Sequence, residues 1–334
     1  MKNIIALTQI EIETFLPGNR LDEAQALLEP YKLVDPTEVE SEEGWKGILK
    51  ECEPEIILAA WKTPTIPEDY HESLPSLKYV CYLPGSIRKL IPRATIENGL
   101  KVTNWGGSIS RTVSEMGLLL MLCCMRRVAH WQQQMHYKAG WKNQDTQTQS
   151  LFERRVGLHG FGSISQQMVP LIKPFTENIS AYSPGVPDSI FEELGVKRAE
   201  TLEELFSEND VIVELASLTE KNYKIVTEEL LRMMPDGAAF VNVGRGLVVD
   251  EEALARVAKE KDLQVGLDVY GVEPLPDDSP FRGMPNVLLL PHLGGPTTDR
   301  RRDAGDLSIG YLKAYRETGE VEDAITLHVY DRAT

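Results

Sequence analysis

Short apolar runs and helical stretches alternate along the first third of the chain. The runs are rich in Val, Ile and Leu and are separated by more polar, helix-forming segments. Such alternation is typical of βαβ units, in which helices connect the strands of a mostly parallel sheet. The segments concerned are residues 4–10, 22–28, 56–60, 79–83 and 102–105.

A long helical pattern, from about Arg111 to Tyr137, separates this region from a second series of apolar runs. The second series predicts six strands with crossover connections, which is the pattern of a doubly wound parallel sheet. The tail, residues 296–317, reads as one helix that stops before Gly319. The six predicted strands are residues 156–158, 179–182, 211–215, 238–243, 264–269 and 287–290.

Length and composition suit a folded protein of two domains. The chain has 334 residues, and domains average about 150 residues. Hydrophobic residues make up 42% and charged residues 26%, which is ordinary globular usage. Lysine and arginine number 35 against 51 acidic residues, for a net charge of −16. An acidic field repels phosphates and anionic membranes, so we expect no nucleic-acid and no membrane partner.

Cysteine usage and apolar runs bear on the cellular compartment. The cysteines lack the CxxC spacing of a zinc site, so we expect reduced thiols and no metal. The apolar stretch before Glu11 is too short for a secretory signal. The run from Gly117 to Met125 is far shorter than the roughly 20 residues of a membrane span. We therefore predict a cytoplasmic protein. The cysteines are Cys52, Cys81, Cys123 and Cys124.

A glycine-rich turn follows the strand predicted at residues 156–158 and opens a helix. Gly160 and Gly162 permit a tight turn and let the backbone approach a pyrophosphate at the helix N-terminus. Ser165 replaces the third glycine of this pattern, and its small side chain still lets helix and strand pack. The alternative is a plain strand-to-helix turn. The residues predicted to bind a dinucleotide here are Gly160, Phe161, Gly162, Ser163 and Ile164.

The tip of the next strand bears on the choice of dinucleotide. An acid is expected there to bind the adenosine ribose, but the sequence has Ser183. The nearest acid is Asp188, and no arginine or lysine follows before Lys197, so the usual grip on a 2′-phosphate is missing as well. Ser183 is either a ribose contact or a turn residue before Pro184. We expect NAD, with modest discrimination that does not exclude NADP.

Three ionisable residues follow the ends of strands in the same predicted sheet. Arg245 follows residues 238–243, while Glu273 and His292 come after the next two strands. In open α/β sheets the ligand crevice lies at the carboxyl ends of the strands, so the three can converge. Each alone could be an ordinary surface or turn residue. Their joint occurrence downstream of a cofactor turn favours a catalytic site.

Four segments together resemble the D-isomer-specific 2-hydroxyacid dehydrogenases. They are residues 157–165, 242–250, 266–274 and 286–295, and a weaker match includes residues 102–115. The resemblance implies an α/β fold of two doubly wound parallel-sheet domains and a homodimer. A Rossmann-type NAD(P)-binding domain, residues 105–292, would be inserted into a smaller flavodoxin-like substrate domain. That substrate domain would consist of residues 1–104 and 293–334.

The resemblance also implies roles for individual residues. Arg245 matches the residue that binds the substrate carboxylate, His292 the acid/base, and Glu273 its acidic partner. In the cofactor site Asp268 matches the residue that holds the nicotinamide carboxamide. Ser217, where many members have proline, and Gly294 are the other positions expected to contact the cofactor. The residues whose backbone N–H groups would meet the substrate carboxylate are Gly85 and Ser86.

The implied activity is hydride transfer between a nicotinamide cofactor and a small 2-hydroxy or 2-keto acid. Arginine binds a carboxylate through two parallel hydrogen bonds. Histidine gives a proton to, or takes one from, the oxygen on the carbon that exchanges hydride. Formate oxidation is a rival, but relatives of that kind have Gln-Pro where this chain has Glu273 and Pro274. A dinucleotide-sensing regulator or an inactive relative on the same fold is the other alternative. Four departures from the family pattern keep this alternative open, at Ile109, Ser165, Ser183 and Ser217, and Leu215 is a further departure near the cofactor.

Overall fold

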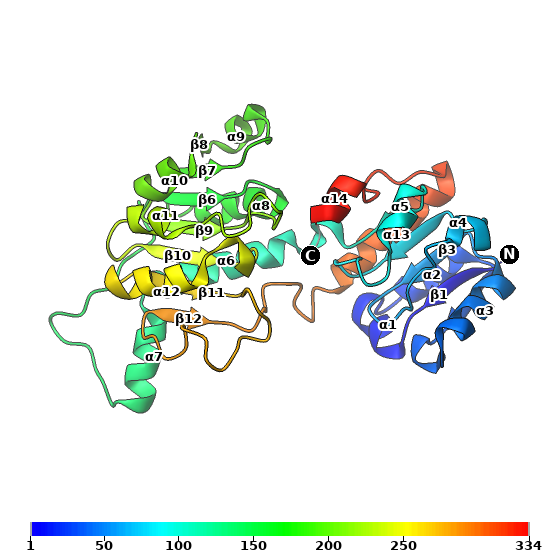
Figure 1. Cartoon of the computed structure of the whole chain (residues 1–334), viewed down its shortest axis with the longest axis horizontal. Helices are drawn as coiled ribbons and strands as arrows, with labels where there is room; N and C mark the ends of the chain where they lie inside the picture. The colour runs from blue at the N-terminus through cyan, green and yellow to red at the C-terminus, as the bar shows by residue number, and fades with distance from the viewer. Residues whose placement is uncertain (1, 333–334) are drawn as a thin grey trace. The chain divides into compact units, whose positions relative to one another are not determined.

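A computed structural model describes residues 2–332, which divide into two compact units (Figure 1). One unit consists of the residues up to Ile109 together with those from Pro296 onward. The other is the continuous stretch Ser110–Gly295. The boundaries therefore lie at 109/110 and 295/296, where the sequence placed them at 104/105 and 292/293. The chain thus enters the inserted unit at the first residue of a long helix.

The first unit is built on a parallel sheet with the strand order β2-β1-β3-β4-β5. This is the flavodoxin-like order that the sequence implied. The edge strand β2 was not expected, because its alternating, half-exposed residues carry only a weak apolar signal. Helix α1 was also missed, since Thr8 caps it and ends the apolar run that had been read as strand to residue 10. The strands are β1 (Asn3–Ala6), β2 (Tyr31–Val34), β3 (Ile56–Ala59), β4 (Tyr79–Tyr82) and β5 (Lys101–Thr103).

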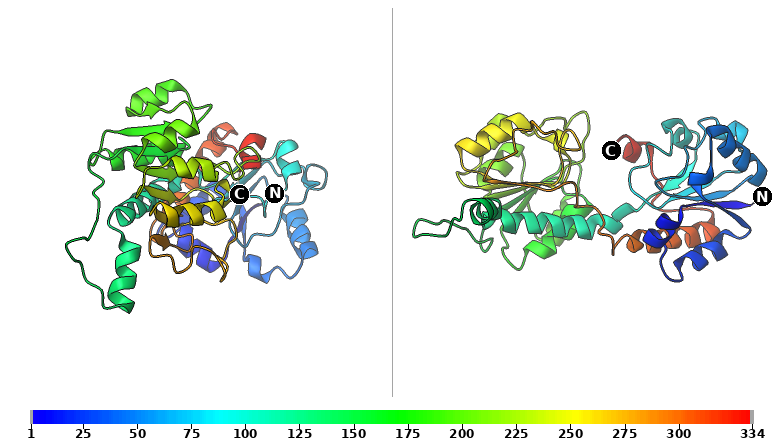
Figure 2. Two further views of the ribbon diagram at one scale, coloured as in Figure 1. Left: turned by 60° about the vertical axis from the view of Figure 1, so that its left-hand side comes forward. Right: turned by 90° about the horizontal axis from the view of Figure 1, so that it is seen from below.

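Helices cover both faces of this sheet (Figure 2). One apolar cluster surrounds Trp45 and Tyr330, and the other surrounds Phe15 and Tyr315. Burial of both faces explains why the central strands are continuously apolar. The tail helix begins at Arg302, later than expected, and Gly319 ends it in the left-handed conformation. The helices are α1 (Gln9–Phe15), α2 (Arg20–Leu28), α3 (Glu42–Cys52), α4 (Tyr70–Ser73), α5 (Arg93–Glu97), α13 (Arg302–Thr318) and α14 (Leu327–Arg332).

The second unit is a larger parallel sheet with the strand order β12-β11-β10-β9-β6-β7-β8. The chain starts at β6 in the middle of the sheet, adds β7 and β8 on one side, and then crosses to add β9 on the other side. This reversal between β6 and β9 is found in Rossmann folds, and ligands bind at such switch points. The short edge strand β8 adds to the six strands expected. The strands are β6 (Val156–His159), β7 (Ile179–Tyr182), β8 (Lys197–Arg198), β9 (Val211–Glu214), β10 (Ala239–Asn242), β11 (Gln264–Leu267) and β12 (Val287–Leu289).

The helix expected from Arg111 to Tyr137 is in fact two helices. Arg127 lies in the left-handed region with a φ of 54°, which ends the first helix and starts the second in a new direction. Such a backbone change leaves the apolar periodicity almost unaltered, so the sequence pattern did not reveal it. The helices of this unit are α6 (Ser110–Met125), α7 (Val128–Tyr137), α8 (Ser163–Ile172), α9 (Asp188–Leu194), α10 (Leu202–Glu208), α11 (Glu228–Met233) and α12 (Glu251–Glu260).

Helix α6 is the core helix of the second unit. Within residues 2–332, the stretch 106–125 that contains it is the one helix long and apolar enough to cross a membrane by length and composition. It packs instead on α8, β10 and β11. Gly266 allows this contact, because a Cβ there would lie 3.2 Å from the Cβ of Leu120. The face of α6 that contains Leu120, Met121 and Cys124 is thus buried inside the unit.

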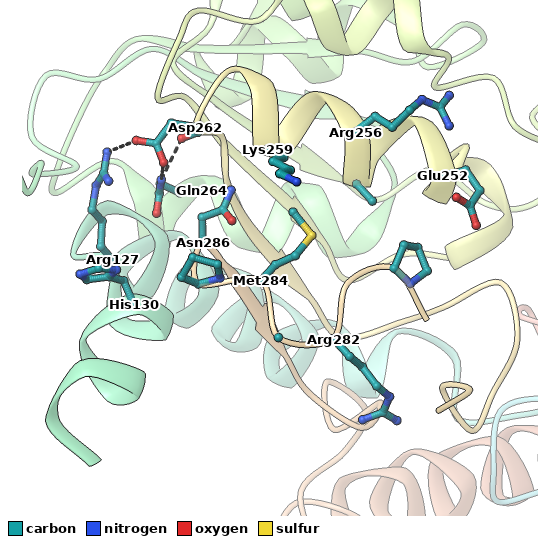
Figure 3. Close-up of a pocket in the computed structure, with 14 residues that line it drawn as sticks. Arg127, His130, Glu252, Arg256, Lys259, Asp262, Gln264, Arg282, Met284 and Asn286 are labelled. Atoms are coloured by element: carbon teal, nitrogen blue, oxygen red, sulfur yellow. Dashed lines mark hydrogen bonds and ion pairs between the residues drawn. The ribbon is translucent and has the colours of Figure 1, made fainter. Parts of the chain in front are cut away.

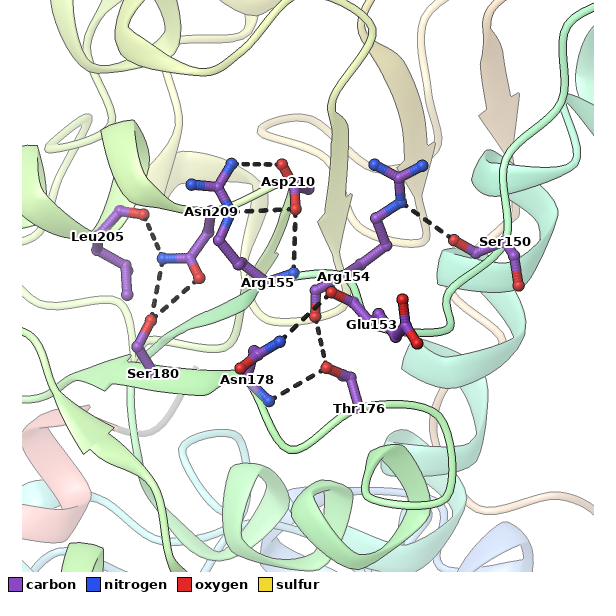
Figure 4. A network of polar contacts seen from close by, with 10 residues as sticks. All are labelled: Ser150, Glu153, Arg154, Arg155, Thr176, Asn178, Ser180, Leu205, Asn209 and Asp210. Atoms are coloured by element: carbon purple, nitrogen blue, oxygen red, sulfur yellow. Dashed lines mark hydrogen bonds and ion pairs between the residues drawn. The ribbon is translucent and has the colours of Figure 1, made fainter.

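Polar side chains tie the amino ends of β6, β7 and β9 together (Figure 4). The carboxylate of Asp210 accepts hydrogen bonds from the backbone and the guanidinium of Arg155, at 2.6–3.1 Å. Burial acts to raise the pKa of Asp210, but these hydrogen bonds outweigh it and lower the pKa. Asn209 and Ser180 form a second, buried link. This network anchors the edge of the sheet opposite the predicted site.

Candidate active site

The turn after β6 has the geometry of a dinucleotide site. Gly160 adopts a φ of +90°, and a Cβ there would lie only 2.8 Å from the backbone nitrogen of Ala216. Gly162 occupies the N-cap of α8 and has no side chain to fill the first-turn N–H groups. Phe161 is fully buried, and the centroid of its ring lies 4.5 Å from that of Phe191. The turn therefore leaves backbone donors for a pyrophosphate, so these residues fit a bound dinucleotide.

Ser165, the departure from the third glycine, is accommodated within the fold. It is buried, and its hydroxyl donates a 2.6 Å hydrogen bond to the carbonyl of Gly160. A second serine, Ser114 on α6, donates to the carbonyl of Ile164 at 2.8 Å. Hydroxyl groups thus brace the turn from inside. Sequence reasoning missed Ser114, whose only signal is a small polar residue on an otherwise apolar helix.

A buried histidine–carboxylate pair lies beneath the turn, and the sequence analysis did not predict it. His159, the last residue of β6, has its Nδ1 2.5 Å from Oε2 of Glu214, the last residue of β9. The other oxygen of Glu214 accepts the N–H of Ala216 at 2.8 Å. The carboxylate therefore joins the end of β6 to the segment on which Gly160 packs. The sequence did contain a signal for this contact, because an ionisable residue ends each of two apolar strands. Such groups are seldom buried unless they are paired, so their pairing could have been predicted.

A cation lies near the tip of β7, where the sequence had predicted none. The sequence has no basic residue between Ser183 and Lys197, yet Arg198 reaches the loop that Ser183 begins. Its guanidinium donates to the carbonyl of Val186 at 2.5 Å. Pairing of β8 with β7 brings this cation back to the loop, which distance along the chain could not reveal. Ser217, on the segment after β9, is exposed, and its carbonyl accepts from Asn222.

Arg245 lies on a turn after β10 that Asn242 holds in place. The side chain of Asn242 accepts the N–H of Gly244 at 3.0 Å and donates to the carbonyl of Arg245 at 3.2 Å. Gly246 is required, because a Cβ there would lie 1.9 Å from the carbonyl carbon of Tyr270. Burial lowers the pKa of Arg245, and the charge of Glu273 partly offsets this effect. A largely desolvated guanidinium is suited to bind an anion, which would restore the solvation that burial removes.

His292 and Glu273 form a hydrogen-bonded pair at the carboxyl edge of the same sheet. Nδ1 of His292 lies 2.7 Å from Oε2 of Glu273, and Oε1 of Glu273 accepts the N–H of Tyr270 at 3.0 Å. Both side chains line a cavity of about 610 Å³. Tyr270 donates its hydroxyl to the carbonyl of Leu290, and burial raises the pKa of Tyr270 to about 12. The backbone of Tyr270 thus holds Glu273 in place, while both side chains remain accessible from the cavity.

Asp268 fixes the backbone just after the histidine. Its two carboxylate oxygens accept the N–H groups of Leu293 and Gly294, each at 2.7 Å. A Cβ at Gly294 would lie 2.7 Å from the same carboxylate, so the close approach needs glycine. His292 itself has a φ of 54°, in the left-handed region that this anchored turn maintains. Asp268 therefore orients His292, and contact with the nicotinamide carboxamide stays a prediction.

Gly85 and Ser86 follow β4 in the other unit. A Cβ at Gly85 would lie 2.2 Å from the indole of Trp105, so the loop needs glycine there. Asn104 donates to the carbonyl of Gly85 at 2.7 Å. Ser86 is exposed. The loop is thus held in one shape at the carboxyl end of its strand, and its contact with substrate stays a prediction.

Comparison with known proteins places the chain in a family. The sequence profile described as the D-isomer specific 2-hydroxyacid dehydrogenase, NAD binding domain, matches residues 118–294. The hydroxypyruvate reductase of Thermotoga maritima is 32% identical over 273 residues, covering 80% of this chain and 87% of that protein. The glyoxylate reductase of Korarchaeum cryptofilum is 28% identical over 277 residues and covers 82% of each chain.

Solved structures share the fold. The glyoxylate reductase from Paecilomyes thermophila superposes with a TM-score of 0.77 at 22% identity, over 97% of this chain and 98% of that one. The D-mandelate dehydrogenase of Rhodotorula graminis gives a TM-score of 0.78 at 20% identity, over 94% of each chain. The profile match and the sequence relatives decide the family. The chain belongs to the D-isomer-specific 2-hydroxyacid dehydrogenases and is an NAD(P)-dependent oxidoreductase that transfers hydride between a nicotinamide and a small 2-hydroxy or 2-keto acid.

Proposed function

We propose that this enzyme reduces small 2-keto acids of the glyoxylate and hydroxypyruvate class to 2-hydroxy acids. The observation that carries the proposal is the hydrogen bond between His292 and Glu273 at the carboxyl edge of the cofactor sheet. The sequence relatives named as hydroxypyruvate and glyoxylate reductases support this class of substrate.

Arg245 binds the carboxylate of the substrate in this proposal. Its guanidinium offers two parallel N–H donors, which fix both the position and the direction of a carboxylate. The carbon next to the carboxylate is then held in one place for reaction. The turn that Asn242 braces keeps the arginine backbone from shifting during turnover.

His292 handles the proton. When bound, the nicotinamide supplies or accepts the hydride. In reduction, Nε2 of His292 donates a proton to the substrate oxygen that becomes the hydroxyl, and in oxidation it takes that proton back. Nδ1 faces Glu273, and the hydrogen bond between them leaves Nε2 as the ring nitrogen available to the substrate.

A panel of 2-keto acids tests the substrate class. Oxidation of NADH and of NADPH would be followed optically with glyoxylate, hydroxypyruvate, pyruvate and bulkier branched or aromatic 2-keto acids. We expect the highest kcat/KM with glyoxylate or hydroxypyruvate. A clear preference for a bulky acid would contradict the proposed class, and no turnover with any acid would contradict the assignment of the reaction itself.

We also propose that two copies of the chain assemble, with helix α7 and the segment after it as the contact. This part of the second unit exposes Tyr137 and Trp141, with 85% and 72% of each residue accessible. Beside it lies a cavity of about 650 Å³ between α7, α12 and residues 280–286, where Met284 faces Lys259 (Figure 3). Aromatic side chains are enriched at protein interfaces relative to the rest of the surface.

Light scattering on the purified protein tests the assembly. We expect the mass of a dimer for the parent and a shift toward the monomer when Tyr137 and Trp141 are both changed to serine. A monomeric parent at micromolar concentration would contradict the proposal.

We place the enzyme in the cytoplasm. The free thiols of Cys52, Cys81 and Cys124 are buried in the described structure and suit a reducing compartment. A disulfide among these cysteines in protein isolated from its natural source would contradict that location.

A further inference from the structure

Edge strand β8 holds a cation against the loop that follows β7. The two strands pair in parallel, with Arg198 opposite Ala181. The guanidinium of Arg198 lies over the ring of Phe191, 4.0 Å from its centroid. It donates to the carbonyl of Val186 at 2.5 Å and lies 3.5 Å from the carbonyl of Ser183. Arg198 is therefore held in one orientation at the tip of β7.

The tip of β7 adjoins the dinucleotide turn. The N–H of Gly160 donates to the carbonyl of Tyr182 at 2.9 Å, immediately before Ser183. In dinucleotide-binding folds the adenosine ribose lies at the end of this second strand. An acid there selects the free 2′-hydroxyl of NAD, whereas a nearby arginine accommodates the 2′-phosphate of NADP. Ser183 carries no charge that would repel a phosphate.

We propose that Arg198 binds the 2′-phosphate of NADP(H) and makes this enzyme prefer NADP(H) over NAD(H). The proposal rests on the dinucleotide turn and not on the class of keto acid. Arginine suits the task, because its planar guanidinium matches the oxygens of a phosphate and its stacking on Phe191 keeps the fork preorganised. This inference revises the expectation, drawn from Ser183 alone, that the cofactor site barely discriminates and leans to NAD.

The present partner of Arg198 is an exposed carboxylate. Asp188, in the first turn of α9, lies 2.6 Å from Nε of Arg198. The side chain of Asp188 is 79% accessible and that of Arg198 is 25% accessible. Because Asp188 is exposed to water, a phosphate with nearly two negative charges can compete with it for the guanidinium. Asp188 therefore weakens the grip of Arg198 without preventing it.

The neighbouring cation provides a matched control. Lys197 precedes Arg198 on β8, and successive side chains of a strand point to opposite faces. Its ammonium pairs with Glu204 and Glu208 on α10, each at 2.9 Å. Removing Lys197 thus deletes one positive charge from the same strand without changing the loop after β7.

Binding of nucleotide fragments tests the proposal without any catalytic step. Calorimetric titration would compare adenosine 2′,5′-bisphosphate with adenosine 5′-monophosphate. We expect the bisphosphate to bind the parent about tenfold more tightly, which corresponds to about 1.4 kcal/mol. Arg198→Ala should remove this difference and leave the affinity for the monophosphate within about twofold. Lys197→Ala should behave like the parent. Asp188→Asn should strengthen binding of the bisphosphate, and Ser183→Asp should weaken it.

Two results would overturn the proposal. One is a parent that binds the two fragments equally. The other is a loss of affinity for both fragments in Arg198→Ala, which would make Arg198 only a clamp on the loop. If Arg198→Ala fails to fold, Arg198→Lys and Asp188→Asn decide the question, because the lysine variant should keep part of the preference and the asparagine variant should enlarge it. Since these titrations contain no keto acid, their failure is separate from failure of the proposed substrate class.

Discussion

Replacing His292 by asparagine is expected to lower kcat for keto-acid reduction by about a hundredfold to ten-thousandfold, the usual contribution of a positioned acid/base. Asparagine keeps a polar side chain of similar size but cannot transfer a proton. Binding of reduced cofactor should stay unchanged, because His292 touches the substrate side of the site in our proposal. Steady-state kinetics gives the first quantity, and quenching of protein fluorescence by the cofactor gives the second.

A companion variant separates proton transfer from general damage. Glu273→Gln keeps a hydrogen-bonding side chain beside His292 but removes the negative charge that faces Nδ1 of the ring. We expect kcat for reduction to fall in this variant while binding of reduced cofactor stays unchanged, because a neutral amide holds Nδ1 less firmly than a carboxylate does. Glu252→Gln, which removes an exposed carboxylate on α12, should turn over like the parent. Near-normal turnover in His292→Asn would show that another group donates the proton, and near-normal turnover in Glu273→Gln would show that the carboxylate does not support the histidine.

Arg245→Lys should lower kcat/KM by roughly a hundredfold while leaving cofactor affinity unchanged. The substitution keeps the positive charge but loses one of two parallel, charge-assisted hydrogen bonds. Such a bond contributes about 1.5–3 kcal/mol, which is roughly tenfold to a hundred-and-fiftyfold in rate. Arg256→Lys, on the exposed face of α12 where Arg256 pairs with Glu228, is the matched control. An equal loss of cofactor affinity in Arg245→Lys would place this arginine at the pyrophosphate or in the scaffold.

Apolar periodicity predicted most of the two parallel sheets and failed where burial is partial. The central strands are buried on both faces, so their residues form continuous apolar runs that are visible in the sequence. The edge strands β2 and β8 are half-exposed, and β8 is only Lys197–Arg198, so neither has such a run. The break between α6 and α7 depends on the left-handed backbone of Arg127, which requires no change in residue pattern.

The residue pattern alone predicted the turn at Gly160 and the positions of Arg245, Glu273 and His292 after successive strands. These features are local, because a tight turn needs glycine where a Cβ would collide, and a residue after a strand lies at the end of that strand.

Contacts between groups far apart in the chain became visible only once the strands and loops were placed as neighbours. His159 and Glu214 are 55 residues apart, Asp268 and Leu293 are 25 apart, and Ser183 and Arg198 are 15 apart. Each contact depends on which strands or loops become neighbours and on their register, because a shift of one residue turns a side chain to the other face of the sheet.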